Sequence, residues 1–256
     1  MRIIRYTHKK DAPRYGWIFD DRVGPIEGSP FEEFRRTEAE IPLEEVQLLA
    51  PTLPSKIICV GRNYVAHAAE HDAEVPEVPL VFLKPPSSLV GPNDIIYLPP
   101  QSQQVEHEGE LAVVIGKRAR WVDPEAALDF VLGYTVGNDV TARDLQRRDG
   151  QWTRGKGFDS FCPLGPWIET DFDPTDALVT VHVNDELRQM ASTRDMVFTV
   201  RQLLAYVTSV MTLEPGDVLL TGTPAGVGPL QAGDSVEVVV EGLGTLTNPV
   251  ETEPAR

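Results

Sequence analysis

VEHEGELAVVIG, residues 105–116, is the most informative stretch of this chain. Its apolar run at residues 111–115 is typical of a strand that is covered on both faces. Because side chains two residues apart on a strand point to the same face, the carboxylates of Glu108 and Glu110 should lie side by side at the start of this strand. Two neighbouring buried carboxylates need a cation or a shared proton. The stretch therefore predicts a site for a hard divalent metal ion.

Glu106 leaves an alternative open. The same alternation places Glu106 on the face of Glu108 and Glu110, and all three carboxylates could lie on the solvent-exposed face of an edge strand. The apolar run that follows Glu110 disfavours this alternative, because it indicates a buried strand.

The composition limits the partners and the cell compartment. With 39 acidic and 23 basic residues, the chain has a formal net charge of -16, which disfavours nucleic acid and anionic membranes as partners. Its two cysteines, Cys59 and Cys162, have no metal-ligand spacing, as expected in a reducing cytoplasm. We expect neither a secretory signal in MRIIRYTHKK nor a membrane helix, since no apolar run reaches roughly 20 residues. A cytoplasmic location is expected.

The pattern of strands and prolines predicts two units. Residues 1–50 form a small β-rich unit with a turn at Asp20 and Asp21, and residues 50–54, APTLP, form a linker. Residues 54–250 form the larger domain, whose predicted strands are KIICVG, PLVFLK, DIIYL, ELAVVIG, FVLGYTVGN, ALVTVHVN, DVLLTGT and SVEVVV. Helices are predicted at residues 64–71, 124–131, 141–146 and 200–210. Short strands between many prolines and glycines predict a folded β architecture and not a doubly wound α/β sheet.

Asp139 lies where the predicted strand FVLGYTVGN meets a helix start. Its carboxylate could reach a metal over the end of the sheet, or it could cap the helix, which is a common use of aspartate. Asn138 or Thr141 could provide the cap instead and leave Asp139 available as a ligand.

His67 and Glu70 share a face of the predicted helix at residues 64–71, with Cβ atoms roughly 5–6 Å apart. The carboxylate could orient the imidazole as a general base. The same letters, HAAEH, match the H-x-x-E-H pattern of zinc peptidases, with His67 and His71 as ligands. A surface helix with incidental histidines is the third interpretation.

Two glycine-containing segments could contact a ligand. Lys156 lies between Gly155 and Gly157, so the backbone could approach a ligand and aim the ammonium inward, although a solvated loop lysine is the alternative. Residues 221–228, TGTPAGVG, follow a predicted strand, and their amides and hydroxyls could cradle an oxyanion. A plain turn is the alternative there.

Five segments together resemble the fumarylacetoacetate hydrolase superfamily in order and spacing: GRNYVAHAAEH, VEHEGELAVVIGK, GYTVGNDVTARDLQ, GKGFDSFCPLGPW and LEPGDVLLTGTPAGVG. The resemblance covers about residues 54–248 and extends to members with a small N-terminal domain, which suits residues 1–50. It implies a mainly β (α+β) fold, a mixed β-sandwich roll, which is usually dimeric and carries Mg²⁺ or Mn²⁺ at its mouth.

The resemblance also implies residue roles by position. The implied metal ligands are Glu108, Glu110 and Asp139, the catalytic residues are His67, Glu70 and Lys156, and the substrate contacts are Arg143, Gln146 and Thr223. The family often has Tyr at His107 and Asp at Glu106, but neither matched position is a ligand. The segment with His67 can act as a lid in the family.

The implied substrate is a small 2-oxo acid. We expect hydrolysis of a C–C bond in an acylpyruvate or another 1,3-diketo acid, through an enolate stabilised by the metal and Lys156, with water activated by His67 and Glu70. Isomerisation or decarboxylation of 2-hydroxymuconate-type or oxaloacetate-like substrates in aromatic catabolism is the alternative, since it shares the enolate. Two other classes of function are possible from the sequence. A zinc peptidase would leave the carboxylates of Glu108, Glu110 and Asp139 unexplained, and a catalytically silent metal-binding or interaction protein is the other class. In either the enzyme or the binding protein, the resemblance implies a homodimer.

Overall fold

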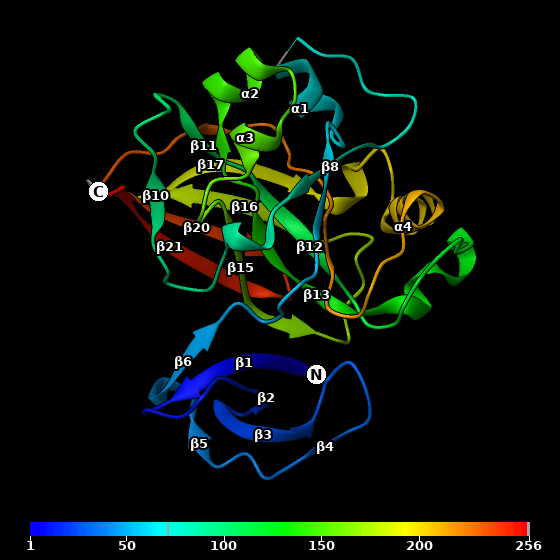
Figure 1. Cartoon of the computed structure of the whole chain (residues 1–256), viewed down its shortest axis with the longest axis vertical. Coiled ribbons are helices and arrows are strands. Elements are labelled where there is room, and N and C mark those ends of the chain that lie inside the picture. The colour runs from blue at the N-terminus through cyan, green and yellow to red at the C-terminus, as the bar shows by residue number, and fades with distance from the viewer. Residues whose placement is uncertain (71, 255–256) are drawn as a thin grey trace.

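The structure, a computed structural model, describes residues 1–70 and 72–254. Strands make up 43% of the residues and helices 17%, which confirms the predicted mainly β fold. The strands form sheets of 13, five and three strands. In Figure 1, helices α1 (Val65–Glu70), α2 (Arg143–Asp149) and α3 (Thr153–Lys156) lie at one end of a large β body, and the N-terminal strands form a smaller unit at the opposite end.

The 13-stranded sheet runs through both parts of the molecule. Its strands are, in spatial order, β4 (Phe34–Arg36), β3 (Arg22–Gly28), β2 (Arg14–Phe19), β1 (Arg2–His8), β15 (Cys162–Glu169), β13 (Val131–Asn138), β12 (Gly109–Ile115), β18 (Val218–Leu220), β7 (Ile57–Gly61) and β8 (Leu80–Lys84). Three strands pair beside this path: β5 (Ile41–Pro42), β6 (Val46–Leu49) and β9 (Leu89–Val90). β12 lies between β13 and β18, and every residue of it is buried, as its apolar run predicts.

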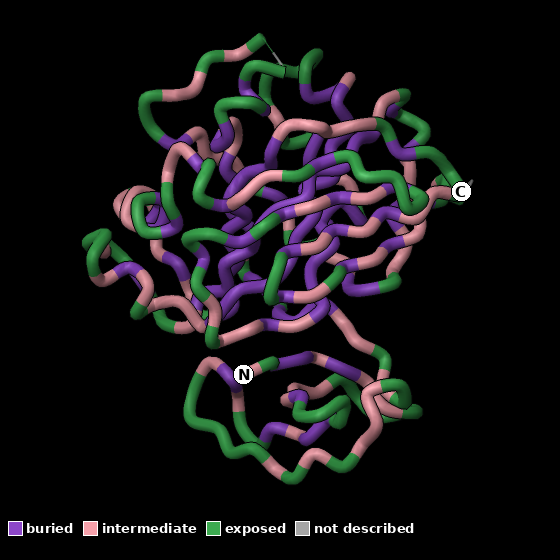
Figure 2. The backbone as a smooth tube through the Cα atoms, turned by 180° about the vertical axis from the view of Figure 1, so that it is seen from behind, coloured by how far each residue is buried: buried purple, intermediate pink, exposed green. Residues whose placement is uncertain are grey.

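A five-stranded sheet packs against β12 and β13 and encloses the main core. Its strands are β10 (Ile96–Leu98), β21 (Gly244–Thr252), β20 (Ser235–Val240), β16 (Leu178–Val183) and β17 (Glu186–Ser192). A Cβ on Gly109 would lie 2.3 Å from Cγ2 of Val181, so only glycine lets the two sheets approach at the start of β12. Figure 2 shows the buried residues concentrated in the strands of this larger body.

The third sheet and the helices α1, α2 and α3 complete the end that carries Glu108 (Figure 1). The sheet consists of β14 (Thr141–Ala142), β11 (Val105–His107) and β19 (Gly228–Pro229). The α-helices are α1 (Val65–Glu70), α2 (Arg143–Asp149), α3 (Thr153–Lys156) and α4 (Val200–Val210). The 3-10 helices are η1 (Leu43–Glu45), η2 (Pro86–Ser88), η3 (Pro124–Phe130) and η4 (Thr193–Asp195).

The predicted helices agree with the structure to different degrees. The helix predicted at residues 200–210 has those bounds, and a capping box at Thr199 and Gln202 explains its start. The segment at 124–130 is a 3-10 helix, and the helix predicted at 141–146 begins only at Arg143, because residues 141–142 pair as β14. The predicted helix at 64–71 spans Val65–Glu70, and its last predicted residue, His71, lies outside the described residues.

The N-terminal unit is joined to the main sheet. β1 pairs antiparallel with β15, with Arg2 opposite Glu169 and Ile3 opposite Ile168. The predicted turn at Asp20 and Asp21 is confirmed, since both residues have positive φ angles of 45° and 58° between β2 and β3. The first strand therefore carries the large sheet from the main body into this unit (Figure 1).

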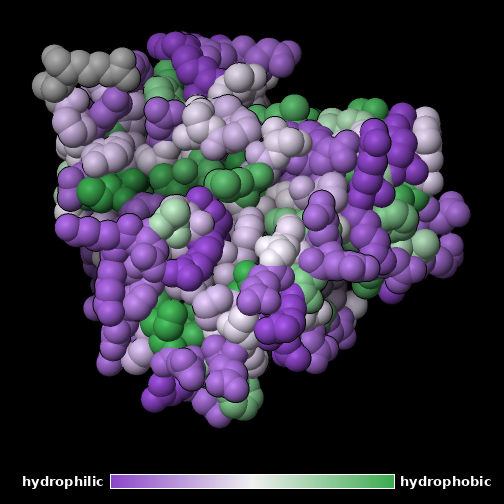
Figure 3. Space-filling view, turned by 60° about the horizontal axis from the view of Figure 1, so that its bottom comes forward, coloured by the Kyte–Doolittle hydropathy of each residue, from purple (hydrophilic) through white to green (hydrophobic). Residues whose placement is uncertain are grey.

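The visible surface is mostly hydrophilic (Figure 3), and neither cysteine forms a disulfide. In Figure 3, hydrophilic side chains cover most of the visible face, and hydrophobic ones form short bands and small patches. Cys59 and Cys162 are free, and both are buried in a small apolar cluster between strands of the main sheet. Among the described helices, none combines the length and the apolar character needed to cross a bilayer.

Candidate metal and substrate site

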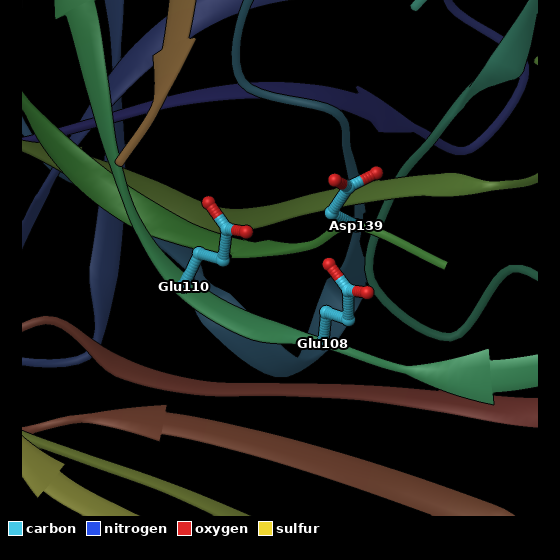
Figure 4. A group of neighbouring side chains, drawn as sticks. All are labelled: Glu108, Glu110 and Asp139. Atoms are coloured by element: carbon cyan, nitrogen blue, oxygen red, sulfur yellow. The ribbon is translucent and has the colours of Figure 1, made fainter. Parts of the chain in front are cut away.

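Three carboxylates meet at the helix-covered end of the large sheet. Glu108 lies between β11 and β12, Glu110 belongs to β12, and Asp139 directly follows β13. Antiparallel pairing of Gly109 with Asn138 brings these strand ends together. Figure 4 shows the carboxylates facing a common space, and one oxygen from each lies within 4.8 Å of the others. The structure thus brings together the three predicted ligands.

Glu106 lies beside the carboxylate group but outside it. The chain pairs in the three-stranded sheet up to His107 and in the 13-stranded sheet from Gly109 onward. Glu106 accepts a hydrogen bond from Nε of Arg143 at 2.7 Å, and Oε1 of Glu108 accepts from the same guanidinium. Glu106 is therefore on the side of Glu108, as strand alternation predicts, but its carboxylate is paired with Arg143 and not with Glu110 and Asp139.

Lys156 joins two of the carboxylates. Its Nζ donates to Oε2 of Glu108 at 2.8 Å and to Oδ2 of Asp139 at 2.6 Å. Burial alone would lower the pKa of Lys156, but these carboxylates raise it, so the ammonium stays charged. The alternative of a solvated loop lysine is wrong, because Lys156 is buried and ends α3. Gly155 lets α3 pack closely against α2, since a Cβ at this position would lie 2.9 Å from the backbone nitrogen of Gln146.

Lys84 is a candidate that the sequence analysis missed. It ends β8, is buried, and donates from Nζ to Oδ1 of Asp139 at 2.6 Å and to the carbonyl of Val140 at 3.0 Å. The available signal was a lysine at the end of the apolar strand PLVFLK, but that pattern is equally typical of a lysine whose ammonium reaches solvent.

Glu110 has no basic partner within residues 1–70 and 72–254. Its Oε2 accepts a hydrogen bond from the amide of Gly222 at 2.6 Å, and a Cβ on Gly222 would lie 2.7 Å from that of Asn63. Burial, followed by the charges of Asp139 and Glu108, raises the pKa of Glu110 well above its usual range. A divalent cation would supply the missing charge, and an all-carboxylate donor set fits Mg²⁺ or Mn²⁺.

Arg143 is held in place by several protein groups. Its guanidinium donates to Oε1 of Gln146 and Oε2 of Glu106, both at 2.7 Å, and to Oε1 of Glu108. Burial would raise the pKa of Glu108, but Lys156 and Arg143 outweigh it and lower that pKa. The side chains of Arg143 and Gln146 are therefore fixed before any substrate binds; their predicted substrate contacts stay predictions.

Helix α1 brings His67 and Glu70 to the same end. Nδ1 of His67 lies 3.5 Å from Oε2 of Glu70, and both oxygens of Glu70 accept from the amide of Gly226 at 3.2 Å. Burial lowers the pKa of His67, so its imidazole is neutral at neutral pH and able to accept a proton. The zinc-peptidase interpretation depends on His71, which lies outside the described residues.

The hydroxyl of Thr223 is positioned by the protein. Oγ1 of Thr223 donates to the carbonyl of Gly109 at 2.9 Å and accepts from Nε2 of Gln189 at 2.8 Å. Oε1 of Gln189 in turn accepts from the amide of Gly109 at 3.1 Å and lies 2.9 Å from Nδ1 of His107. The predicted oxyanion cradle at residues 221–228 is thus partly used to hold the protein itself.

A cavity of about 350 Å³ opens beside the carboxylates. The predicted site residues that line it are His67, Glu108, Arg143, Gln146, Lys156 and Thr223. Phe82 and Trp152 form an apolar wall, with ring centroids 5.1 Å apart, and Arg62 and Arg147 also line the space. A cavity of this size and lining suits a small, partly apolar anion.

Family comparisons cover both parts of the chain. Residues 56–251 match the family described as fumarylacetoacetate (FAA) hydrolase, C-terminal, and residues 1–51 match the family described as Rv2993c-like, N-terminal. Together the two matches span nearly all the residues.

Individual relatives are similar over most of their length. Protein Rv2993c of Mycobacterium tuberculosis is 50% identical over 224 residues, which are 86% of this chain and 84% of that protein. Oxaloacetate tautomerase Fahd2a, mitochondrial, of Rattus norvegicus is 46% identical over 222 residues, 82% of this chain and 71% of that protein. The crystal structure of 5-carboxymethyl-2-hydroxymuconate delta-isomerase from Mycobacterium smegmatis has a TM-score of 0.93 at 48% identity, covering 99% of this chain and 100% of that one.

Proposed function

The chain belongs to the fumarylacetoacetate hydrolase family, and we propose that it acts on 2-oxo acids through an enolate, with the help of a divalent metal ion. Glu110 carries this proposal. It is buried against Glu108 and Asp139 and, among the described residues, has no basic partner, whereas Lys156 already spans the other two carboxylates. A second positive charge at this point would complete the site.

The 2-oxo carboxylate end of the substrate binds next to Lys156. Mg²⁺ or Mn²⁺ held by Glu108, Glu110 and Asp139 would supply a Lewis acid there. The Lys156 ammonium lies beside the ligand oxygens, so it stabilises negative charge that develops on the oxo oxygen of the substrate. Burial strengthens this effect, since little water screens the charge.

His67 accepts the proton. Its imidazole is neutral at neutral pH and lines the cavity, and Glu70 lies beside Nδ1. A positioned general base of this kind contributes roughly 10²–10⁴-fold to the rate. Because Glu70 is anchored to the amide of Gly226, the dyad keeps its place relative to residues 222–223 of the same loop.

Hydrolysis of an acylpyruvate is the first specific activity that we propose. His67 takes a proton from water, the resulting hydroxide attacks the distal carbonyl, and the C–C bond breaks to give a carboxylic acid and the enolate of pyruvate. The imidazolium of His67 then gives its proton to the enolate carbon, which yields pyruvate and restores the neutral base. The position of Lys156 beside Glu108 and Asp139 supports this route, because an ammonium there would stabilise negative charge on the enolate oxygen of a substrate bound at these carboxylates.

Isomerisation or tautomerisation of a 2-oxo acid is the second candidate. It is favoured by the 46% identity to a protein named oxaloacetate tautomerase and the 48% identity to one named a delta-isomerase. In this reaction His67 removes a proton from the carbon next to the oxo group, and the proton returns to a different atom. The same charge stabilisation by Lys156 serves both reactions.

An activity panel tests the shared proposal and separates the two reactions. Pyruvate release from acylpyruvates reports hydrolysis, and loss of the enol absorbance of oxaloacetate reports tautomerisation; both are measured with Mg²⁺, with chelator and for Glu108→Gln. We expect turnover that requires Mg²⁺ and is lost in Glu108→Gln, while the exposed Glu32→Gln behaves as the wild type. Turnover that persists after a chelator has removed the divalent metal ion would contradict the proposal.

A further inference from the structure

Two arginine side chains at the cavity have no acidic partner among residues 1–70 and 72–254. Arg62 and Arg147 both line it, and within the described residues the side chain of neither forms an ion pair or a hydrogen bond. Two nearby arginines do have acidic partners: Arg143 binds two glutamates, and Arg148 lies 3.7 Å from Asp149. In a chain with a net charge of -16, two unpaired guanidinium groups at one cavity concentrate positive potential where a ligand enters.

Arg62 is held at the cavity by its backbone. Its φ angle is 57°, in the left-handed region that arginine rarely adopts. Asn63 fixes this conformation, because its side-chain amide donates to the carbonyls of Phe198 and Thr221 at 3.0 and 2.7 Å and its Oδ1 accepts from the amide of Phe198 at 2.8 Å. On the other side, a Cβ on Gly61 would lie 2.7 Å from the Trp152 ring. An unfavourable conformation kept by this many contacts is typical of functional sites.

Arg147 continues the wall formed by Arg143. The two residues are four apart on α2, so they are neighbours on one face of this helix, with Cβ atoms roughly 5–6 Å apart. Arg143 is buried and its guanidinium is committed to Glu106, Glu108 and Gln146. Arg147 is exposed, and its donors are available at the outer end of the same wall.

We propose that Arg62 and Arg147 form a second anion site, which selects 2-oxo acids that carry another carboxylate at the far end. The inference rests on the proposed function, which places the 2-oxo carboxylate beside Lys156. The apolar wall of Phe82 and Trp152 accommodates the carbon chain between the two charged ends. Guanidinium groups bind carboxylates with paired hydrogen bonds, so they prefer a charged end to an apolar one of the same length.

A matched pair of substrates tests this site: 2,4-dioxoheptanedioate and 2,4-dioxoheptanoate, which differ only in the terminal carboxylate. With the Mg²⁺-loaded enzyme, we expect Arg62→Gln and Arg147→Gln each to lower kcat/KM for the dioate by ~10–100-fold, mainly through KM. For the monoacid, kcat/KM should change less than about twofold in each variant, because its far end is apolar and offers the arginines no negative charge. Arg148 is next to Arg147 but does not line the cavity, so Arg148→Gln is the control. It should leave kcat/KM unchanged for both substrates.

Equilibrium binding separates the anion site from the proposed function. Calorimetry with 2-oxoheptanedioate and 2-oxoheptanoate measures the preference for the second carboxylate without turnover, and we expect the wild type to prefer the dioate and the two variants to lose the preference. Equal losses for both ligands, or a preference kept in both variants, would overturn the anion site. If the wild type turns over neither dioxo acid but still prefers the dioate, the proposed function fails and the anion site stands.

Discussion

The Nζ of Lys156 lies 2.6 Å from Oδ2 of Asp139, and Oδ1 of the same carboxylate accepts from Nζ of Lys84 at the same distance. One buried aspartate is thus held between two buried lysines, one from β8 and one from α3. The two lysines have different neighbours, since only Lys156 reaches Glu108 and lines the cavity. We therefore expect their substitutions to have different effects.

Lys156→Met should separate metal binding from catalysis. Removing the ammonium takes away positive charge beside Glu108 and Asp139, so Mn²⁺ should bind more tightly, by about tenfold or more. The rate should fall by roughly 10²–10³-fold, because charge on the substrate oxygen loses its partner. Calorimetric Mn²⁺ titration beside steady-state kinetics measures both. Weaker Mn²⁺ binding in the variant would show that Lys156 supports the metal and not the reaction.

Lys84→Met should act mainly on stability. The Lys84 and Asp139 side chains are buried, and removing one partner of a buried ion pair destabilises a protein by about 3–5 kcal/mol. Urea denaturation of the metal-free protein measures the free energy of unfolding. Lys117→Met, at an exposed position, is the matched control and should have little effect. The double variant Lys84→Met with Asp139→Asn should lose less stability than the two single losses added together.

The pH dependence should report His67. Because burial lowers its pKa, the imidazole is deprotonated at neutral pH, and kcat/KM should fall only as the pH drops through a value below 6.5. His67→Gln should lower kcat by roughly 10²–10⁴-fold and remove this acid limb, while Mn²⁺ binding stays unchanged. An acid limb that persists in His67→Gln would assign it to another group.

Glu70→Gln should move that acid limb. The carboxylate of Glu70 lies beside Nδ1 of His67 and raises its pKa, in opposition to burial. Without the negative charge the pKa of His67 falls further, so the limb should shift to lower pH, and kcat should also decrease because the imidazole is less well oriented. The pH profile of kcat/KM measures the shift. A limb that moves to higher pH would show that Glu70 does not act on His67 through its charge.

The main elements of the site could be predicted from the sequence because they are local. The buried strand β12, the helix α4 and the approach of Glu108 to Glu110 follow from residues a few positions apart. The partners of these carboxylates could not be predicted. Lys84 contacts Asp139 across 55 positions, and the amide of Gly222 contacts Glu110 across 112.

Glu106 shows the same limit at short range. Strand alternation placed it on the side of Glu108, and the guanidinium of Arg143 does contact both carboxylates. Alternation could not predict that Glu106 would lie outside the carboxylate group, because the chain passes from one sheet to another between His107 and Gly109. This change depends on β14 and β19, which pair with β11 and come from distant parts of the chain, and a local pattern carries no information about such partners.

Glu108, Glu110 and Asp139 are proposed to hold one divalent metal ion, and calorimetric titration of the metal-free protein with Mn²⁺ measures this binding. We predict one Mn²⁺ per chain for the wild type and for Glu32→Gln. In Glu110→Gln the affinity should fall by more than the ~10–100-fold that loss of an outer hydrogen-bond partner causes, with the fold retained by circular dichroism. No Mn²⁺ binding by the wild type, or equal affinity in Glu110→Gln, would show that these carboxylates do not form a metal site.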